Sequence, residues 1–183
     1  HPWGARSARL AQPDRMVLDL DPAEDLSFDS VVAAALALRE RVLALGLAPF
    51  CKTTGGKGLH LVVPLAPGAR WDRLHAVAAA ICEDLAREAP QRFTTQSALA
   101  GRDGRIFLDF QRNARGASAV APWSPRARPG APMAMPLDWA EVTEGLDPRR
   151  FTIATAPARL ETPDPWAGME EAARPLPPAS KLR

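Results

Sequence analysis

The chain has 183 residues, of which 46% are hydrophobic and 24% charged, and its formal net charge is +2. This composition fits one well-packed domain with a single core and excludes a collagenous or largely disordered chain. The net charge is too small to indicate a nucleic-acid-binding protein by itself. No apolar run approaches the ~18 residues of a membrane span, and no secretory signal is present, so we expect a cytoplasmic protein with no membrane partner.

The first predicted strand, residues 15–22, ends in two carboxylates. Residues 1–14 before it show no period and indicate an irregular lead-in. Because side chains alternate faces along a strand, Asp19 and Asp21 share one face, and Met16, Leu18 and Leu20 point the other way, to the core. Pro22 cannot donate to a ladder, so the strand should stop there. The two carboxylates form a candidate metal site, although solvated acids at a strand end give the same pattern.

A helix, a glycine loop and a second strand are predicted next. Apolar residues recur at helical spacing from residue 27 or 29 to residue 45, and Gly46 is a plausible residue to follow the helix end. A short extended segment, 49–53, leads into a glycine loop at 54–58. Residues 59–65 then alternate as a strand. The tight connection predicts a hairpin.

The second half of the chain is predicted with shorter elements. Residues 71–88 indicate an amphipathic helix that should pack beside the first, and residues 101–104 are a strong turn signal. The remaining expected elements are a strand at 105–110, an extended segment at 117–124, a Pro-rich connector at 129–136, and short helices at 137–144 and 147–160. The tail at 161–183 is Pro-rich and is expected to wrap the domain or to be disordered.

The two cysteines and the arginines carry less specific signals. Cys51 and Cys82 are far apart and lack a Cys-x-x-Cys spacing, so we expect buried, reduced thiols. Residues 92–128 contain seven arginines against two acids: Arg92, Arg102, Arg105, Arg112, Arg115, Arg126 and Arg128. The planar guanidinium suits phosphate oxygens, although an arginine-rich composition places many such residues without a role.

Three aspartates share one character, because Asp19, Asp21 and Asp109 each lie on the non-core face of an apolar strand. Hard oxygen ligands suit Mg²⁺ or Mn²⁺, which keep waters and bridge to substrate phosphates. Two such ions about 3.5–4 Å apart can activate an attacking hydroxyl and stabilise a leaving oxygen. This set therefore predicts phosphoryl-transfer chemistry.

The glycine loop is a candidate cradle for a triphosphate. Glycines let backbone N–H groups approach phosphate oxygens, and Lys57 adds a positive charge. Because Lys57 is followed by Gly58 and not by Ser or Thr, the loop is not a Walker A motif. His60 lies on the polar face of the next strand, where its imidazole can donate to a phosphate. Taken alone, a glycine hairpin or a single histidine is more often structural.

Three segments together resemble the successive motifs of the archaeo-eukaryotic primase superfamily. They are Leu18-Asp19-Leu20-Asp21, the run from Lys52 through the glycine loop to His60, and the run from Phe107 through Asp109 and Arg112 to Gly116. More narrowly, they resemble the polymerase domain of bacterial ATP-dependent DNA ligase D. His1-Pro2-Trp3-Gly4 and the run from Ala121 to Arg126 extend the likeness from the start to about Trp166.

The resemblance implies a template-directed nucleotidyltransferase of non-homologous end joining that favours ribonucleotides and Mn²⁺. By position, Asp19, Asp21 and Asp109 would hold two metal ions. Thr54, Lys57, His60, Arg112 and Arg126 would bind the nucleoside triphosphate. Thr54 stands where the family has serine, and Trp123 where it has tyrosine. The implied partners are DNA ends, gapped duplex, a ligase domain and the Ku end-binding protein, and the implied location is the bacterial nucleoid.

The expected fold is an α/β (α+β) primase-polymerase core with an antiparallel or mixed sheet flanked by helices. We expect a catalytic domain at residues 1–160, lacking its N-terminal part, and a Pro-rich extension at 161–183. Because no initiator Met is present, the chain is expected to be a piece of a longer protein. Two other functions use the same pattern: a non-catalytic nucleic-acid-binding module and a metal-dependent nuclease or phosphohydrolase. The complete set of three aspartates disfavours the first, and the glycine loop with its arginines disfavours the second.

Overall fold

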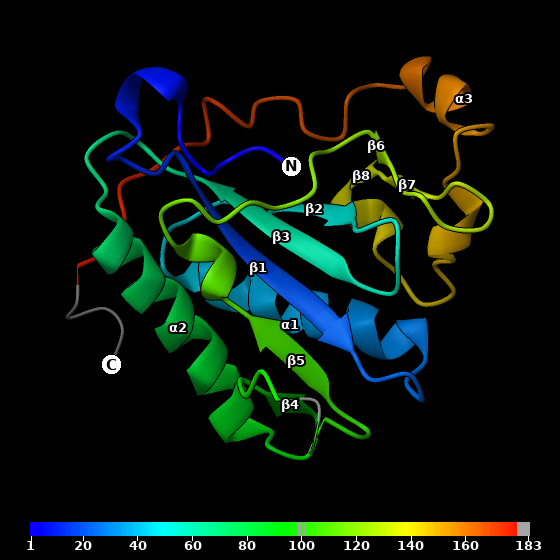
Figure 1. Ribbon diagram of the computed structural model, residues 1–183, viewed down its shortest axis with the longest axis horizontal. Helices are drawn as coiled ribbons and strands as arrows, with labels where there is room; N and C mark the ends of the chain where they lie inside the picture. Colours follow the sequence, from blue (N-terminus) through cyan, green and yellow to red (C-terminus); the bar gives the residue numbers. More distant parts are fainter. Residues whose placement is uncertain (99, 101, 179–183) are drawn as a thin grey trace.

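A six-stranded sheet forms the centre of the fold, with the strand order β4-β5-β1-β3-β2-β8 (Figure 1). The computed structural model describes residues 1–98, 100 and 102–178. The strands of this sheet are β1 (Arg15–Pro22), β2 (Phe50–Thr53), β3 (Leu59–Pro64), β4 (Phe93–Thr94), β5 (Ile106–Asp109) and β8 (Pro136–Leu137). Only the β4–β5 pair is parallel, so the sheet is mixed, as predicted. The predicted hairpin is formed by β2 and β3.

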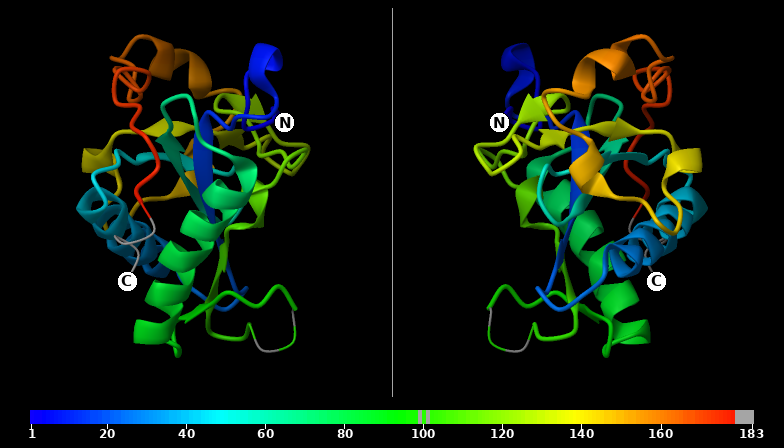
Figure 2. Two further views of the ribbon diagram at one scale, coloured as in Figure 1. Left: turned by 90° about the vertical axis from the view of Figure 1, so that its left-hand side faces the viewer. Right: turned by 90° about the vertical axis from the view of Figure 1, so that its right-hand side faces the viewer.

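Two long helices, α1 (Phe28–Ala44) and α2 (Trp71–Glu88), cover one face of this sheet (Figures 1 and 2). The opposite face, called the open face because neither long helix packs on it, is partly covered by the segment after β5. The alternate residues Met16, Leu18 and Leu20 of β1 are fully buried with the helices in one core. Gly46 has a φ of 78°, which places it in the left-handed region that ends many helices. Both helices and their packing side by side were predicted.

The elements after β5 differ most from the prediction. The predicted helix at 137–144 is wrong, because Leu137 pairs with Cys51 as part of β8 and only a 3-10 turn, η3 (Trp139–Glu141), follows. The side chain of Asp138 caps that turn. Pairing with the central sheet therefore overrides the local helical pattern at this point.

The predicted helix at 147–160 is also wrong over most of its length. A 3-10 turn, η4 (Pro148–Arg150), comes first, and helix α3 (Ala156–Leu160) forms only at the end. Between them, Met133 N donates to Phe151 O and Ile153 N donates to Ala131 O. These hydrogen bonds hold the segment extended.

Four short elements complete the fold. A second, two-stranded sheet pairs β6 (Ser124–Pro125) with β7 (Met133–Ala134). The extended segment predicted at 117–124 is strand-like only at Ser118, which bridges to Trp3, and at the start of β6. Turns η1 (Ser7–Arg9) and η2 (Gln111–Asn113) are 3-10 helices.

The ends of the chain and its glycine turn fit the prediction where they are described. Leu65 bridges to Arg174 and Trp166 donates from Nε1 to Cys51 O at 2.8 Å, so the C-terminal segment wraps the domain up to residue 178. In the turn before β5, Gly104 has a φ of 65°, whereas Gly101 lies outside the described residues. Cys51 and Cys82 are free and buried. None of the described helices is long and apolar enough to cross a bilayer.

Candidate nucleotide and metal site

The open face of the sheet carries a row of four polar side chains from four neighbouring strands. Asp19 of β1 is the cross-strand partner of His60 on β3 and of Asp109 on β5, and His60 is the partner of Lys52 on β2. Cross-strand partners lie on the same face of a sheet, so the row runs straight across it. Residues from distant parts of the sequence are therefore brought together by strand register alone.

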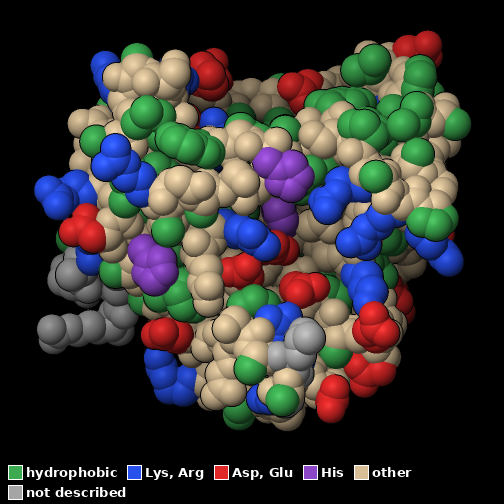
Figure 3. All heavy atoms as spheres, viewed as in Figure 1, with side chains coloured by type: hydrophobic (Ala, Val, Ile, Leu, Met, Phe, Trp, Pro, Cys, Tyr) green, Lys and Arg blue, Asp and Glu red, His purple; other side chains and the backbone are tan. Residues whose placement is uncertain are grey.

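A cleft of about 340 Å³ lies over this row. All the residues predicted for the site line it except Asp109, which lies beneath Arg112. The lining side chains that matter for the argument are His1, Asp19, Asp21, Thr54, Lys57, His60, Arg112, Arg126 and Arg128. Figure 3 shows acidic side chains at the centre of the hollow, with histidines above them and basic side chains on one flank.

Arg112 connects the two buried aspartates. Its Nε lies 3.3 Å from Oδ2 of Asp109 and 3.8 Å from Oδ2 of Asp19. The guanidinium comes from η2, which follows β5 directly and folds back over the sheet. Arg112 is itself half-exposed, so it can also face a ligand in the cleft.

Asp19 and His60 form a buried pair in which His60 Nε2 lies 3.3 Å from Asp19 Oδ2. Burial alone would raise the pKa of Asp19, but the hydrogen bond and charge of His60, together with Arg112 and Lys52, hold it below its ordinary value. Burial lowers the pKa of His60, and the attraction of Asp19 does not restore it. At neutral pH the pair is therefore a carboxylate beside a neutral imidazole.

The other two aspartates have different surroundings. Burial raises the pKa of Asp109, opposed by the backbone N–H of Gln111, which donates to Oδ1 at 2.7 Å, and by Arg112. Asp21 is more open, with 56% of its side chain exposed, and Arg102 donates to its Oδ2 at 3.0 Å. Arg102 also stacks on Phe107, 4.0 Å from the ring centroid.

The three carboxylates fit a divalent cation in their chemistry and in their shared face. Oxygen ligands of this kind suit Mg²⁺ or Mn²⁺, which need few protein ligands beside waters and phosphates. As the side chains lie, no group of three His, Cys, Asp or Glu within the described ranges is arranged to hold one ion. The reason is local, because Asp21 turns to Arg102 and Asp19 turns to His60.

The glycine loop is closed by Thr54 and packed against strand β1. Thr54 N donates to Gly58 O at 3.1 Å, and the Thr54 hydroxyl also bonds the Gly58 backbone. A Cβ atom on Gly58 would lie 2.1 Å from the carbonyl oxygen of Leu20, between the two acids of β1. Only glycine permits this approach.

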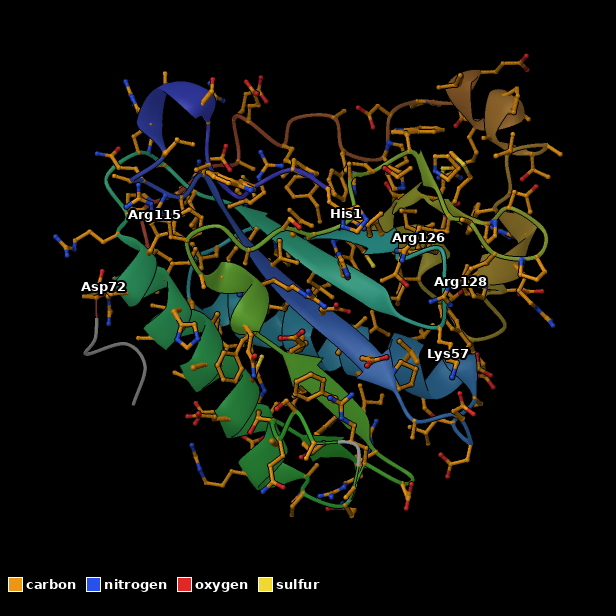
Figure 4. All side chains as sticks on the ribbon, in the orientation of Figure 1. His1, Lys57, Asp72, Arg115, Arg126 and Arg128 are labelled. Carbon is orange, nitrogen blue, oxygen red and sulfur yellow. The ribbon has the colours of Figure 1, made fainter. Side chains whose placement is uncertain are left out.

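Two arginines lie over the loop. Arg126 donates from Nη1 to Thr54 O at 2.9 Å, and a Cβ on Gly55 would lie 2.5 Å from its Cγ. Arg128 passes close to Gly56. Figure 4 shows Arg126, Arg128 and Lys57 along one side of the cleft, with His1 at its upper edge. This flank is suited to an anionic ligand.

Sequence reasoning missed several residues of this site. His1 and Arg128 line the cleft, Lys52 lies beneath it, and the side chain of Asn113 anchors η2. Arg128 follows Arg126 at strand spacing, and Lys52 interrupts an apolar strand. The local sequence pattern could therefore have indicated both residues. The role of Asn113 depends on the folded chain.

Comparison with known proteins agrees with this geometry. Residues 1–166 match the family model "LigD, primase-polymerase domain". The chain is 42% identical over 170 residues to the multifunctional non-homologous end joining protein LigD of Pseudomonas aeruginosa, covering 91% of this chain and 20% of that protein. It is 32% identical over 157 residues to the bifunctional LigD of Bacillus subtilis, covering 85% of this chain and 26% of that protein.

A solved structure is similar as well. The polymerase domain of Mycobacterium tuberculosis ligase D, determined in complex with DNA, superposes with a TM-score of 0.80 at 28% identity. The match covers 88% of this chain and 56% of that one. The predicted fold class is thereby confirmed, and so is the resemblance that the three motifs suggested. The chain spans about a fifth to a quarter of the length of the two LigD proteins.

Proposed function

Because this chain belongs to the LigD primase-polymerase family, we propose that it is a metal-dependent, template-directed nucleotidyltransferase that adds nucleotides at DNA gaps and breaks during non-homologous end joining. One observation carries the proposal. The same cleft has Asp19 and Asp21 at its floor, with Asp109 beneath Arg112, and the glycine loop with its arginines on its flank. A triphosphate with bound cations matches both halves of that arrangement.

The proposed roles follow from position. Asp19, Asp21 and Asp109 would hold one or two Mn²⁺ or Mg²⁺ ions, which, when bound, offset phosphate charge and lower the barrier to attack by a hydroxyl. Arg126 and Lys57 would face the phosphates from the loop side. A triphosphate offers each of them a charge-assisted hydrogen bond.

The remaining contacts would orient the nucleotide. The Thr54 hydroxyl and the loop N–H groups lie at the lip of the cleft, where they can donate to phosphate oxygens. His60 can donate from Nε2, and Arg112 can turn from the aspartates toward the phosphates. Arg112 would thereby exchange one anionic partner for another.

The proposal also covers the preferred metal ion, the preferred nucleotide and the partners. We propose that Mn²⁺ supports the reaction better than Mg²⁺ and that ribonucleotides are favoured. The proposed partners are gapped duplex and broken DNA ends, a ligase domain in the same polypeptide and the Ku protein at the end. With DNA as its substrate, the protein would act at the bacterial nucleoid.

A primer-extension assay tests the function. The protein is incubated with a gapped duplex, Mn²⁺ and a labelled ribonucleotide complementary to the template base, with a non-complementary nucleotide as the control. Addition of the matched nucleotide is the expected result. Shortening of the primer would instead indicate a nuclease, and retention of the DNA without any extension would indicate a non-catalytic binding module.

A further inference from the structure

Lys52 is a buried charge that the proposed triphosphate contacts leave unexplained. Its side chain is on β2 and only 1% of the residue is exposed. Its ammonium donates to the carbonyl of Thr53 at 3.4 Å, a long contact, and none of the ion pairs formed within the described part of the chain includes it. An ammonium buried without a carboxylate is costly, so its presence here calls for a partner.

His60 is the neighbour that lacks a hydrogen bond. Lys52 and His60 are cross-strand partners on the open face of the sheet. Nε2 of His60 faces Asp19, whereas its Nδ1 is buried and makes no hydrogen bond to any described residue. A buried ring nitrogen of this kind is normally paired.

A small cavity connects the two groups. It holds about 30 Å³ and is lined by Lys52 and His60 together with apolar side chains that include Val17, Val62 and Trp166. A water molecule needs about 10–15 Å³ of such space and at least two polar partners. The ammonium and the imidazole nitrogen supply a donor and an acceptor.

We propose that Lys52 is a positioning residue for His60, whose Nδ1 accepts a hydrogen bond from a single water that the Lys52 ammonium holds in this cavity. An ammonium can only donate, so the water must accept from Lys52 and donate onward to Nδ1. Nδ1 is then the unprotonated nitrogen, and Nε2 carries the hydrogen. This inference rests on the proposed function in one respect, that Nε2–H donates to the triphosphate.

The charge states of the two groups agree with this arrangement. Asp19 Oδ2 faces Nε2 at 3.3 Å, so Nε2 carries a hydrogen, and the ammonium beside the ring disfavours a second proton on Nδ1. Burial lowers the pKa of Lys52 to about 8, with Asp19 opposing the change. The amine therefore remains mainly protonated at pH 7 and can act only as a donor.

The first test observes the tautomer without any nucleotide. Nitrogen NMR of the protein with ¹⁵N-labelled histidine at pH 7 separates the two ring nitrogens, and the His60 signals are assigned by their loss in His60→Gln. Because Asp19 accepts from Nε2, we expect the Nε2–H form in both proteins, and in Lys52→Met a downfield change in the chemical shift of Nδ1, which loses its hydrogen bond. Arg149→Met, which removes an exposed basic side chain outside the cavity, is the control and should leave the spectrum unchanged. An Nδ1 chemical shift in Lys52→Met equal to that of the native protein would overturn the proposal.

The second test uses triphosphate affinity, measured by calorimetry in Mn²⁺. Lys52→Met should weaken binding about tenfold, whereas Lys52→Gln, which keeps a donor without the charge, should restore most of the loss. In a His60→Gln background, Lys52→Met should weaken triphosphate affinity by less than a further twofold, because Lys52 acts through the imidazole. Equal losses in both backgrounds, or equal losses for Met and Gln, would show a general charge effect and refute the positioning role. A native protein that binds no triphosphate would refute the proposed function and leave the NMR result to decide this one.

Discussion

The side-chain amide of Asn113 pairs with the backbone of Val17 through two hydrogen bonds, in the way that the backbone of a neighbouring strand would. Val17 N donates to Asn113 Oδ1 at 2.8 Å, and Asn113 Nδ2 donates to Val17 O at 2.7 Å. The same Nδ2 donates to Phe110 O at 2.8 Å. The amide thus continues the ladder of β1 where β5 has ended. Because Arg112 is the preceding residue, this contact fixes the turn that carries Arg112 over the aspartates.

Replacing Asn113 with Asp should loosen that turn. The carboxylate can still accept from Val17 N, but it cannot donate to the two carbonyl oxygens and would face them with its own charge. We expect the free energy of unfolding in urea to fall by about 1–3 kcal/mol and triphosphate affinity to fall several-fold. Gln111→Glu, an exposed amide-to-acid change two residues away, is the control. Equal behaviour of the two variants would contradict the assigned role.

Asp109→Ala should abolish nucleotide addition and leave a cooperatively folded protein. The change removes the carboxylate beneath Arg112 and takes a partner from that arginine, but the core side of β5 keeps Ile106 and Leu108. Primer extension and thermal unfolding measure the two effects separately. Asp103→Ala, in the exposed turn before β5, should extend primers normally. Normal extension by Asp109→Ala would contradict the metal-site prediction.

His60→Ala and Arg126→Ala should weaken triphosphate binding more than Mn²⁺ binding. Each variant loses a charge-assisted hydrogen bond of about 1.5–3 kcal/mol, which corresponds to roughly a ten- to hundredfold loss of affinity. Calorimetric titrations with a nucleotide and with Mn²⁺ alone give the two affinities. Arg149→Ala, which removes an exposed arginine paired with Asp147, serves as the control. A loss confined to Mn²⁺ binding would reverse the roles assigned to these side chains.

Arg102→Ala should increase the affinity for Mn²⁺. Arg102 occupies Asp21 Oδ2 at 3.0 Å, so a cation must displace it to use that oxygen. Because Asp21 is exposed, the pair is worth only about 0–1 kcal/mol, and we expect a gain of no more than about fivefold. Mn²⁺ titration followed by electron paramagnetic resonance measures it, with Arg105→Ala as the control. A weaker Mn²⁺ affinity would mean that Arg102 supports the site.

Lys52 should make stability depend on pH in the alkaline range. Burial lowers its pKa in the folded protein to about 8 from 10.5, so between these values the unfolded chain binds more protons than the folded one. The unfolding free energy should therefore rise with pH from about 8 to 10.5 in the native protein, relative to Lys52→Met. Urea unfolding of both proteins across that range gives the difference. A difference that stays constant with pH would contradict the shifted pKa.

The acidic strand, the glycine hairpin and both long helices follow from local patterns in the sequence. Alternation placed Asp19 and Asp21 on one face, and the tight link between residues 53 and 59 required a hairpin. These elements are predictable because the pattern that defines each of them is complete within a few consecutive residues. Alternation in the strand predicted at 105–110 added the third acid, Asp109, and the family resemblance then gave all three the same role.

What the sequence could not disclose depends on register and on distant partners. The pairing of Leu137 with Cys51 turns a helical pattern into strand β8. In the sequence, Asn113 resembles an ordinary turn residue, and its role depends on the contact with Val17 of β1 in the folded chain. The burial of Lys52 is likewise a consequence of the segments that close over it, including the C-terminal tail at Trp166. Each of these contacts spans more of the chain than any local pattern can describe.

The close approach of Gly58 to the carbonyl of Leu20 fixes the position of the glycine loop relative to the acidic strand β1. The loop rests on the backbone between Asp19 and Asp21, so the gap between phosphate cradle and carboxylates cannot widen or narrow without breaking that contact. For a nucleoside triphosphate bound as proposed, the cations at one end and the phosphate contacts at the other would therefore be held at a separation that the backbone sets.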